Sequence, residues 1–235
     1  MQRIFTDFDG PIMDVSERYY QVYQHCLHQV QEVGQALTVL SKADFWRLKR
    51  AQIPERQIGQ FSGLHDDQAR YFARLRRDTV HSVPYLVHDQ VLPGAIAALE
   101  HLQRLGYELV VVTMRRTQTL NQALNQHNLE RFFAPDHRYA LPDDYRKEAD
   151  IIEKPRLIGQ ALADLSPAQT TWMIGDTEAD MAAAHAYDIP VIAVLSGIRD
   201  RERLLSCNPT WVTPDLYEAV NVILDKTPAE GTAGK

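Results

Sequence analysis

The chain has 235 residues, of which 45% are hydrophobic and 24% are charged, and its formal net charge is −6. This length is enough for one large domain or for a core domain with a smaller companion. The negative charge argues against a general nucleic-acid binder, because phosphate contact favours a basic face, and no apolar run approaches the ~20 residues that a membrane-spanning helix needs.

Cysteine use and the first residues bear on the cellular compartment. Cys26 and Cys207 lie far apart in the chain, so they indicate neither a disulfide framework nor a zinc site. The first residues enter an apolar segment directly, without the basic and apolar regions of a secretory signal. We therefore expect a protein of the reducing cytoplasm.

Short apolar runs predict five strands, at residues 3–8, 107–113, 170–175, 190–195 and 210–213. Their nearly continuous apolar character is typical of strands that are covered on both faces, as in a parallel sheet. Helical patterns separate the later strands, and the one at 93–106 opens with Pro93 and closes at Gly106, as helices often do. This alternation predicts an α/β fold with a doubly wound parallel sheet, a Rossmann-like core.

Residues 15–90 interrupt the alternation, because they carry helical patterns and little strand signal. We predict that they form a small helical cap domain, inserted into a discontinuous α/β core made of residues 1–14 and 91–226. The stretch 137–153 is expected to form an extra loop. The last residues, 227–235, are small and polar and contain Pro and Gly, which is typical of a disordered tail.

Polar side chains follow three of the predicted strands. Asp7 and Asp9 come at the end of the first strand, Thr113 ends the second, and Asp176 follows the third, with Asp180 four residues later. In open α/β sheets, ligands bind outside the carboxyl ends of the strands. We therefore expect these side chains to line one crevice.

The same crevice is expected to contain a lysine. Lys154 lies at the predicted start of a helix, where Pro155 suits the first helical position, and Lys147 is its rival. Carboxylates suit Mg²⁺, a hard cation that prefers oxygen ligands, while a lysine and a hydroxyl can hold the oxygens of a phosphate. An aspartate can attack phosphorus to form an aspartyl-phosphate, and a second carboxyl can transfer the proton.

Four short motifs occur in order along the chain: "DFDGPIMD" at 7–14, "VVVTM" at 110–114, "EKP" at 153–155 and "GDTEAD" at 175–180. In these motifs the chain resembles the haloacid dehalogenase-like hydrolase superfamily, and within it the branch of phosphatases and phosphomutases with a helical cap, which includes phosphoglycolate phosphatase. The resemblance implies that Asp7 is the nucleophile and a Mg²⁺ ligand. It implies that Asp9 is the general acid and base, with its backbone carbonyl on the metal.

The resemblance also implies roles for the other four candidates. Asp176 would be the second carboxylate ligand of Mg²⁺, and Asp180 would act on the metal through water or by orienting its surroundings. Thr113 and Lys154 would hold the transferring phosphoryl group. The carboxylate at Asp9 favours a phosphatase over a dehalogenase, because an alkoxide leaving group needs a proton and a halide does not.

The implied function is a Mg²⁺-dependent phosphatase that acts on a small phosphorylated metabolite, with neither nucleic acid nor membrane as a partner. Two alternatives stay open: a phosphomutase with the same intermediate, and a non-catalytic module that binds a phosphorylated ligand. Arg115 and Arg116, which follow Thr113, are candidates for contact with the substrate or its phosphate. Lys49, in the helical segment, is expected to be exposed to solvent.

Overall fold

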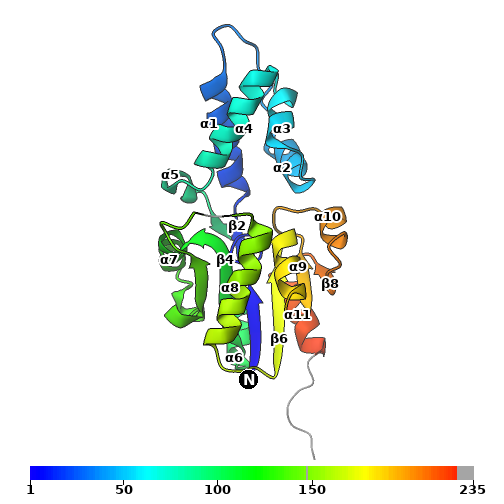
Figure 1. The fold of residues 1–235 in the computed structure, drawn as a ribbon. Helices are drawn as coiled ribbons and strands as arrows, with labels where there is room; N and C mark the ends of the chain where they lie inside the picture. The colour runs from blue at the N-terminus through cyan, green and yellow to red at the C-terminus, as the bar shows by residue number, and fades with distance from the viewer. Residues whose placement is uncertain (147, 227–235) are drawn as a thin grey trace, which may run out of the picture.

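The computed structural model describes residues 1–146 and 148–226, so the predicted tail at 227–235 lies outside the described residues. Its centre is a six-stranded parallel sheet with the strand order β5-β4-β1-β6-β7-β8 (Figure 1). The strands are β1 (Gln2–Thr6), β4 (Glu108–Arg116), β5 (Arg138–Leu141), β6 (Thr170–Gly175), β7 (Val191–Val194) and β8 (Trp211–Thr213). The predicted fold class, a doubly wound parallel sheet, is confirmed.

Helices cover both faces of this sheet. They are α6 (Ala95–Arg104), α7 (Thr117–Gln126), α8 (Asp150–Asp164), α9 (Glu178–His185), α10 (Arg201–Leu205) and α11 (Leu216–Lys226), with short 3₁₀ turns at Glu130–Phe132 and Pro135–His137. Successive strand residues point to opposite faces: Ile4 packs into one hydrophobic cluster and Phe5 into the other. Burial on both faces explains why these strands are almost continuously apolar.

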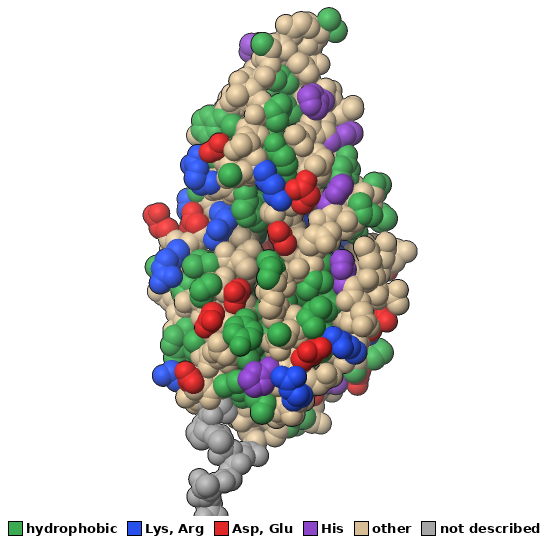
Figure 2. Space-filling model, turned by 180° about the vertical axis from the view of Figure 1, so that it is seen from behind, with side chains coloured by type: hydrophobic (Ala, Val, Ile, Leu, Met, Phe, Trp, Pro, Cys, Tyr) green, Lys and Arg blue, Asp and Glu red, His purple; other side chains and the backbone are tan. Residues whose placement is uncertain are grey.

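The remaining helices form a separate body above the carboxyl ends of the strands, which we call the helical lobe (Figure 1). It consists of α1 (Ser16–Val30), α2 (Lys42–Arg50), α3 (Glu55–Phe61), α4 (Asp66–Thr79) and α5 (Val83–Leu86). The lobe has its own hydrophobic cluster, in which Tyr23, Phe45 and Phe72 are fully buried. Figure 2 shows the lobe as the narrower end of an elongated molecule.

Two short strands connect the lobe to the α/β core. The chain leaves the core through β2 (Met13–Asp14) and returns through β3 (Gln90–Val91), and these two strands pair antiparallel. The two crossings therefore lie side by side, next to the first motif. This arrangement places the lobe over the end of β1.

The structure corrects two local predictions. Part of the expected loop at 137–153 is β5, whose alternating burial at Tyr139 and Leu141 is typical of a half-buried edge strand. The helix that carries Lys154 begins at Asp150, so Pro155 lies inside it and not at its first position. Pro155 has no N–H for the carbonyl of Ile151, an exposed residue in the first turn of the helix.

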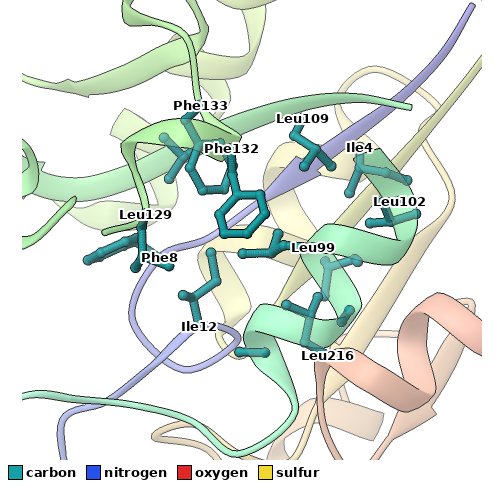
Figure 3. Packing of buried hydrophobic residues seen from close by; sticks show 14 of the residues in the cluster. Ile4, Phe8, Ile12, Leu99, Leu102, Leu109, Leu129, Phe132, Phe133 and Leu216 are labelled. Atoms are coloured by element: carbon teal, nitrogen blue, oxygen red, sulfur yellow. The ribbon is translucent and has the colours of Figure 1, made fainter. Parts of the chain in front are cut away.

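Phe8 anchors the segment that follows β1. Its ring is fully buried and points into the same cluster as Leu99 of α6 and Phe132 (Figure 3). Ile12 enters the cluster from the turn that follows. Burying these apolar side chains fixes the backbone on either side of Phe8, and with it the two aspartates that flank it.

Candidate functional site

The carboxyl ends of the two central strands meet at Asp7. Asp7 follows β1, and its N–H donates to the carbonyl of Ile174 in β6 at 2.9 Å. Asp176 follows the same strand β6, so the ladder between β1 and β6 brings the two aspartates together. Thr113 lies within β4, two residues beyond Val111, which is the register partner of Thr6.

Three buried carboxylates form what we call the acidic cluster: Asp7, Asp176 and Asp180. Each residue offers one carboxylate oxygen, and these three oxygens all lie within 4.8 Å of one another. The Nζ atom of Lys154, which is fully buried, contacts Asp7 and lies 2.5 Å from Oδ1 of Asp180. Four of the six predicted site residues, from three separate segments of the chain, are therefore in one place.

Asp180 also has a local structural role. Its Oδ2 accepts hydrogen bonds from the N–H of Asp176 at 3.2 Å, and from the N–H and hydroxyl of Thr177 at 3.0 and 2.8 Å. The bond from the N–H of Thr177 is part of a capping box at the start of α9. The other oxygen faces Lys154, so Asp180 joins the helix start to the acidic cluster.

Two glycines allow the chain to pass close to Asp176. Gly10 has a φ of 96°, and a Cβ there would lie 2.3 Å from Cγ of Asp176. A Cβ on Gly197 would lie 1.8 Å from Oδ2 of Asp176. Since no side chain fits at either position, the Asp176 carboxylate lies in a cradle of backbone.

The acidic cluster has three carboxylates but only one lysine, Lys154, in contact with it. Burial raises the pKa of Asp7 to about 7, although Lys154 opposes the shift, and burial together with Asp7 and Asp180 raises the pKa of Asp176 well above its ordinary value. Burial lowers the pKa of Lys154, but Asp180 and Asp7 outweigh it, so that the net pKa is raised. A set of clustered carboxylate oxygens with one lysine fits a hard divalent cation, which would offset the remaining repulsion.

Asp9 faces a different set of partners. Its Oδ1 lies 2.6 Å from Nη2 and 2.8 Å from Nε of Arg115, and its Oδ2 lies 3.0 Å from Nη2 of Arg18. Both arginines also contact Asp89, Arg18 at 3.1 Å through Nε. Burial raises the pKa of Asp9, but Arg115 and Arg18 outweigh this effect and hold it well below its usual range. Cations thus face the first two aspartates of the first motif: a lysine contacts Asp7, and two arginines contact Asp9.

The sequence did not reveal Arg18 and Asp89, because each lies in the long helical segment with no recognisable motif around it. Both are buried, and they lie where the chain enters and leaves the helical lobe. Arg115 was a candidate for substrate contact, but in the structure it binds Asp9 and Asp89. Arg116 donates to the carbonyl of Pro142 at 2.7 Å.

Other predictions have mixed outcomes. Thr113 is buried, and its hydroxyl accepts the N–H of Arg115 at 3.3 Å, while its role toward phosphate stays a prediction. Lys147, the rival of Lys154, lies outside the described residues. The expected exposure of Lys49 was wrong: its side chain is only 14% exposed, it pairs with Glu55, and burial lowers its pKa.

Comparison with known proteins settles the family. A model of the haloacid dehalogenase-like hydrolase family matches residues 1–188. The chain belongs to this family. This finding confirms the resemblance that the four motifs carried and the prediction of a hydrolytic enzyme.

Two curated relatives extend the match. The chain is 26% identical over 230 residues to a phosphoglycolate phosphatase of Synechococcus elongatus, covering 95% of this chain and 99% of the relative. A phosphoglycolate phosphatase of Mesorhizobium japonicum is 26% identical over 213 residues, with 84% of each chain covered. These matches confirm the predicted phosphatase branch of the family.

Two solved structures show the same fold. A predicted phosphatase from Clostridium acetobutylicum has a TM-score of 0.69 and 21% identity, covering 95% of this chain and 98% of the other. A haloacid dehalogenase-like family hydrolase from Streptococcus pneumoniae has a TM-score of 0.67 and 23% identity, covering 94% of this chain and 97% of the other.

Within residues 1–146 and 148–226, no helix is both long and apolar enough to cross a membrane.

Proposed function

We propose that the chain is a Mg²⁺-dependent phosphomonoester hydrolase that acts through an aspartyl-phosphate on Asp7. One observation carries the proposal: the buried carboxylate of Asp7 contacts Lys154 and lies within 4.8 Å of the carboxylates of Asp176 and Asp180. Such a group of acidic and basic side chains at the ends of parallel strands suits phosphoryl transfer, in which positioning and charge stabilisation supply most of the catalysis.

The donor set of the acidic cluster fits Mg²⁺. Asp7 and Asp176 would hold the ion with the backbone carbonyl of Asp9, and Asp180 would keep Lys154 and the start of α9 in place. When bound, the ion supplies positive charge that stabilises the phosphoryl oxygens and offsets the repulsion among the carboxylates.

The side chains of this site then divide the reaction between them. A carboxylate oxygen of Asp7 attacks phosphorus while the bond to the leaving oxygen breaks, and a protonated Asp9 gives that oxygen its proton. Because Arg115 and Arg18 hold the pKa of Asp9 well below its usual range, this step requires that substrate binding loosen these ion pairs. Asp9 next takes a proton from the water that attacks the aspartyl-phosphate, which releases phosphate and restores Asp7. Lys154 and the hydroxyl of Thr113 hold the phosphoryl oxygens during both steps.

The helical lobe would serve as the cap of this site, with residues 15–90 as the cap domain and residues 1–14 and 91–226 as the catalytic core. Its position above the strand ends (Figure 1) suits the exclusion of bulk water and the selection of substrate. We propose a small phosphorylated metabolite as the substrate. Since the relatives described above are phosphoglycolate phosphatases, phosphoglycolate is the first compound to test.

The test is phosphate release from an aryl phosphate and from phosphoglycolate, with Mg²⁺ and with excess chelator. The wild-type chain should turn over at least one ester only with Mg²⁺, and Asp7→Asn should be inactive. Asp188→Asn is the matched control, because Asp188 is exposed and its φ of 53° suits asparagine equally well. Turnover that survives in Asp7→Asn would exclude Asp7 as the nucleophile, and a sugar phosphate isomerised without phosphate release would indicate a phosphomutase.

A further inference from the structure

The helical lobe contacts the α/β core at a second place, apart from its two chain crossings. The guanidinium of Arg50, the last residue of α2, donates to the carbonyl of Leu195 at 2.8 Å and to that of Arg199 at 3.1 and 3.2 Å. In return, the N–H of Asp200 donates to the carbonyl of Arg50 at 3.1 Å. We call residues 195–200, which follow β7, the docking loop.

The docking loop also contacts the acidic cluster. The N–H of Ile198 donates to Oδ2 of Asp176 at 2.6 Å. Gly197 lies against the same carboxylate, so closely that a Cβ there would overlap it. The docking loop is thus bound by Arg50 on one side and holds Asp176 on the other.

A second set of contacts ties the lobe to the start of α9. Gln52, in the turn after α2, donates to Oε1 of Glu178 at 2.8 Å, and Glu178 pairs with Arg199 of the docking loop at 2.7 Å. Glu178 lies between Asp176 and Asp180 in the fourth motif. The end of α2 therefore reaches the docking loop directly and, through Glu178, the segment that carries Asp176 and Asp180.

The hydrogen bonds of Arg50 depend on the geometry of its guanidinium group more than on its positive charge. All three of its donated hydrogen bonds go to carbonyl oxygens, which the planar fork of a guanidinium can reach simultaneously. A lysine at this position would keep the charge but present a single ammonium group. The two side chains therefore differ in how well they can fix the docking loop.

We propose that Arg50 is a positioning residue for Asp176: by docking the lobe it fixes the docking loop, which holds the Asp176 carboxylate in the acidic cluster. This inference rests on the proposed function, because it takes Asp176 as a ligand of the divalent cation. Coupling between two sites is reciprocal. Cation binding at Asp176 therefore favours the docked position of the lobe as well.

The experiment measures the dissociation constant of Mg²⁺ alone by isothermal titration calorimetry, using the full chain without substrate. The variants are Arg50→Ala, Arg50→Lys and the control Arg47→Ala, which removes a 70% exposed arginine of the same helix that pairs with Asp44 at 3.4 Å. Arg50→Ala should raise the constant at least ~5-fold, the lower end of typical couplings between sites. Arg50→Lys should give an intermediate value, and Arg47→Ala should stay within about twofold of wild type.

Two outcomes would overturn the inference: an Arg50→Ala constant within twofold of wild type, or an equal loss in Arg47→Ala. Circular dichroism and the melting temperature of each metal-free variant check that it folds. If Arg50→Ala fails to fold, Gln52→Ala should raise the constant instead, and no increase there would count against the inference. A wild-type chain that binds no Mg²⁺ would remove the proposed metal site together with the inference, whereas unchanged binding in Arg50→Ala would remove the inference alone.

Discussion

Replacing Gly197 with alanine should displace one carboxylate of the acidic cluster. The added Cβ would lie 1.8 Å from Oδ2 of Asp176, whereas ordinary contact begins at 3.4 Å, so the two groups must separate by about 1.6 Å. The same oxygen accepts the N–H of Ile198 at 2.6 Å, and this hydrogen bond would break or lengthen. Gly197→Ala therefore moves a proposed metal ligand without changing any charge.

The expected loss of activity is large. A misplacement of about 1 Å in an active site can cost on the order of 100-fold in rate, so Mg²⁺-dependent phosphate release by Gly197→Ala should fall by about that factor. Strain from the extra methyl group should lower the free energy of unfolding by ~1–3 kcal/mol. Phosphate release is measured over a range of Mg²⁺ concentrations, and urea unfolding at fixed pH.

Gly159→Ala is the matched control. A Cβ on Gly159 would lie 2.2 Å from the hydroxyl of Tyr187, but Tyr187 is 41% exposed and its ring can turn away. The control should therefore keep wild-type turnover per folded molecule. If Gly197→Ala stays within about twofold of wild type, the tight cradle around Asp176 does not govern the site, and the reasoning fails.

Two further predictions concern charge. Asp89→Ala removes a fully buried carboxylate that contacts Arg18 and Arg115. It should lower the free energy of unfolding, measured in urea, by ~3–5 kcal/mol, as breaking a buried ion pair does. Asp78→Ala, at an exposed position, is the control, and equal effects of the two variants would refute the role of burial. In the metal-free protein the pKa of Asp7 is raised by burial from 3.8 to about 7, so its contribution to stability is full below pH ~4 and is lost as the pH rises through 7. Mg²⁺ binds the ionised carboxylate, so the rise in melting temperature that Mg²⁺ causes should grow from about pH 5 to 8. A rise that stays constant over this range would contradict the assignment of Asp7 as a ligand of Mg²⁺.

The buried charges around Asp9 show why stability and geometry need separate tests. Arg18, Asp89 and Arg115 are almost completely buried, and only Asp9 of the four keeps some exposure. Replacing a buried ion network with apolar residues is often neutral or stabilising, so its presence at the lobe crossing is weak evidence for stability. Its clearest structural effect is to tie Asp9 to both crossings at once.

Local sequence patterns were enough to predict five of the six strands of the sheet. A strand buried on both faces needs a short apolar run, and a helix start or end needs particular residues, and both signals lie within a few positions of the chain. The strand β5 escaped notice because it has four residues, of which only Tyr139 and Leu141 are buried. The start of α8 was placed too late because Pro155, here inside the helix, imitates a first-turn proline.

The amino-acid sequence was enough to place Asp7 and Asp176 at the carboxyl ends of two strands, because a short apolar run and the polar residues after it are contiguous in the chain. The folded structure was needed to show that Arg18 contacts both Asp9 and Asp89, and that Arg50 contacts the docking loop. These partners are separated by 9 to 149 positions along the chain. Their contacts depend on how the lobe packs on the core. This packing is the sum of many small contributions from buried side chains, and it leaves no periodic pattern in the amino-acid sequence.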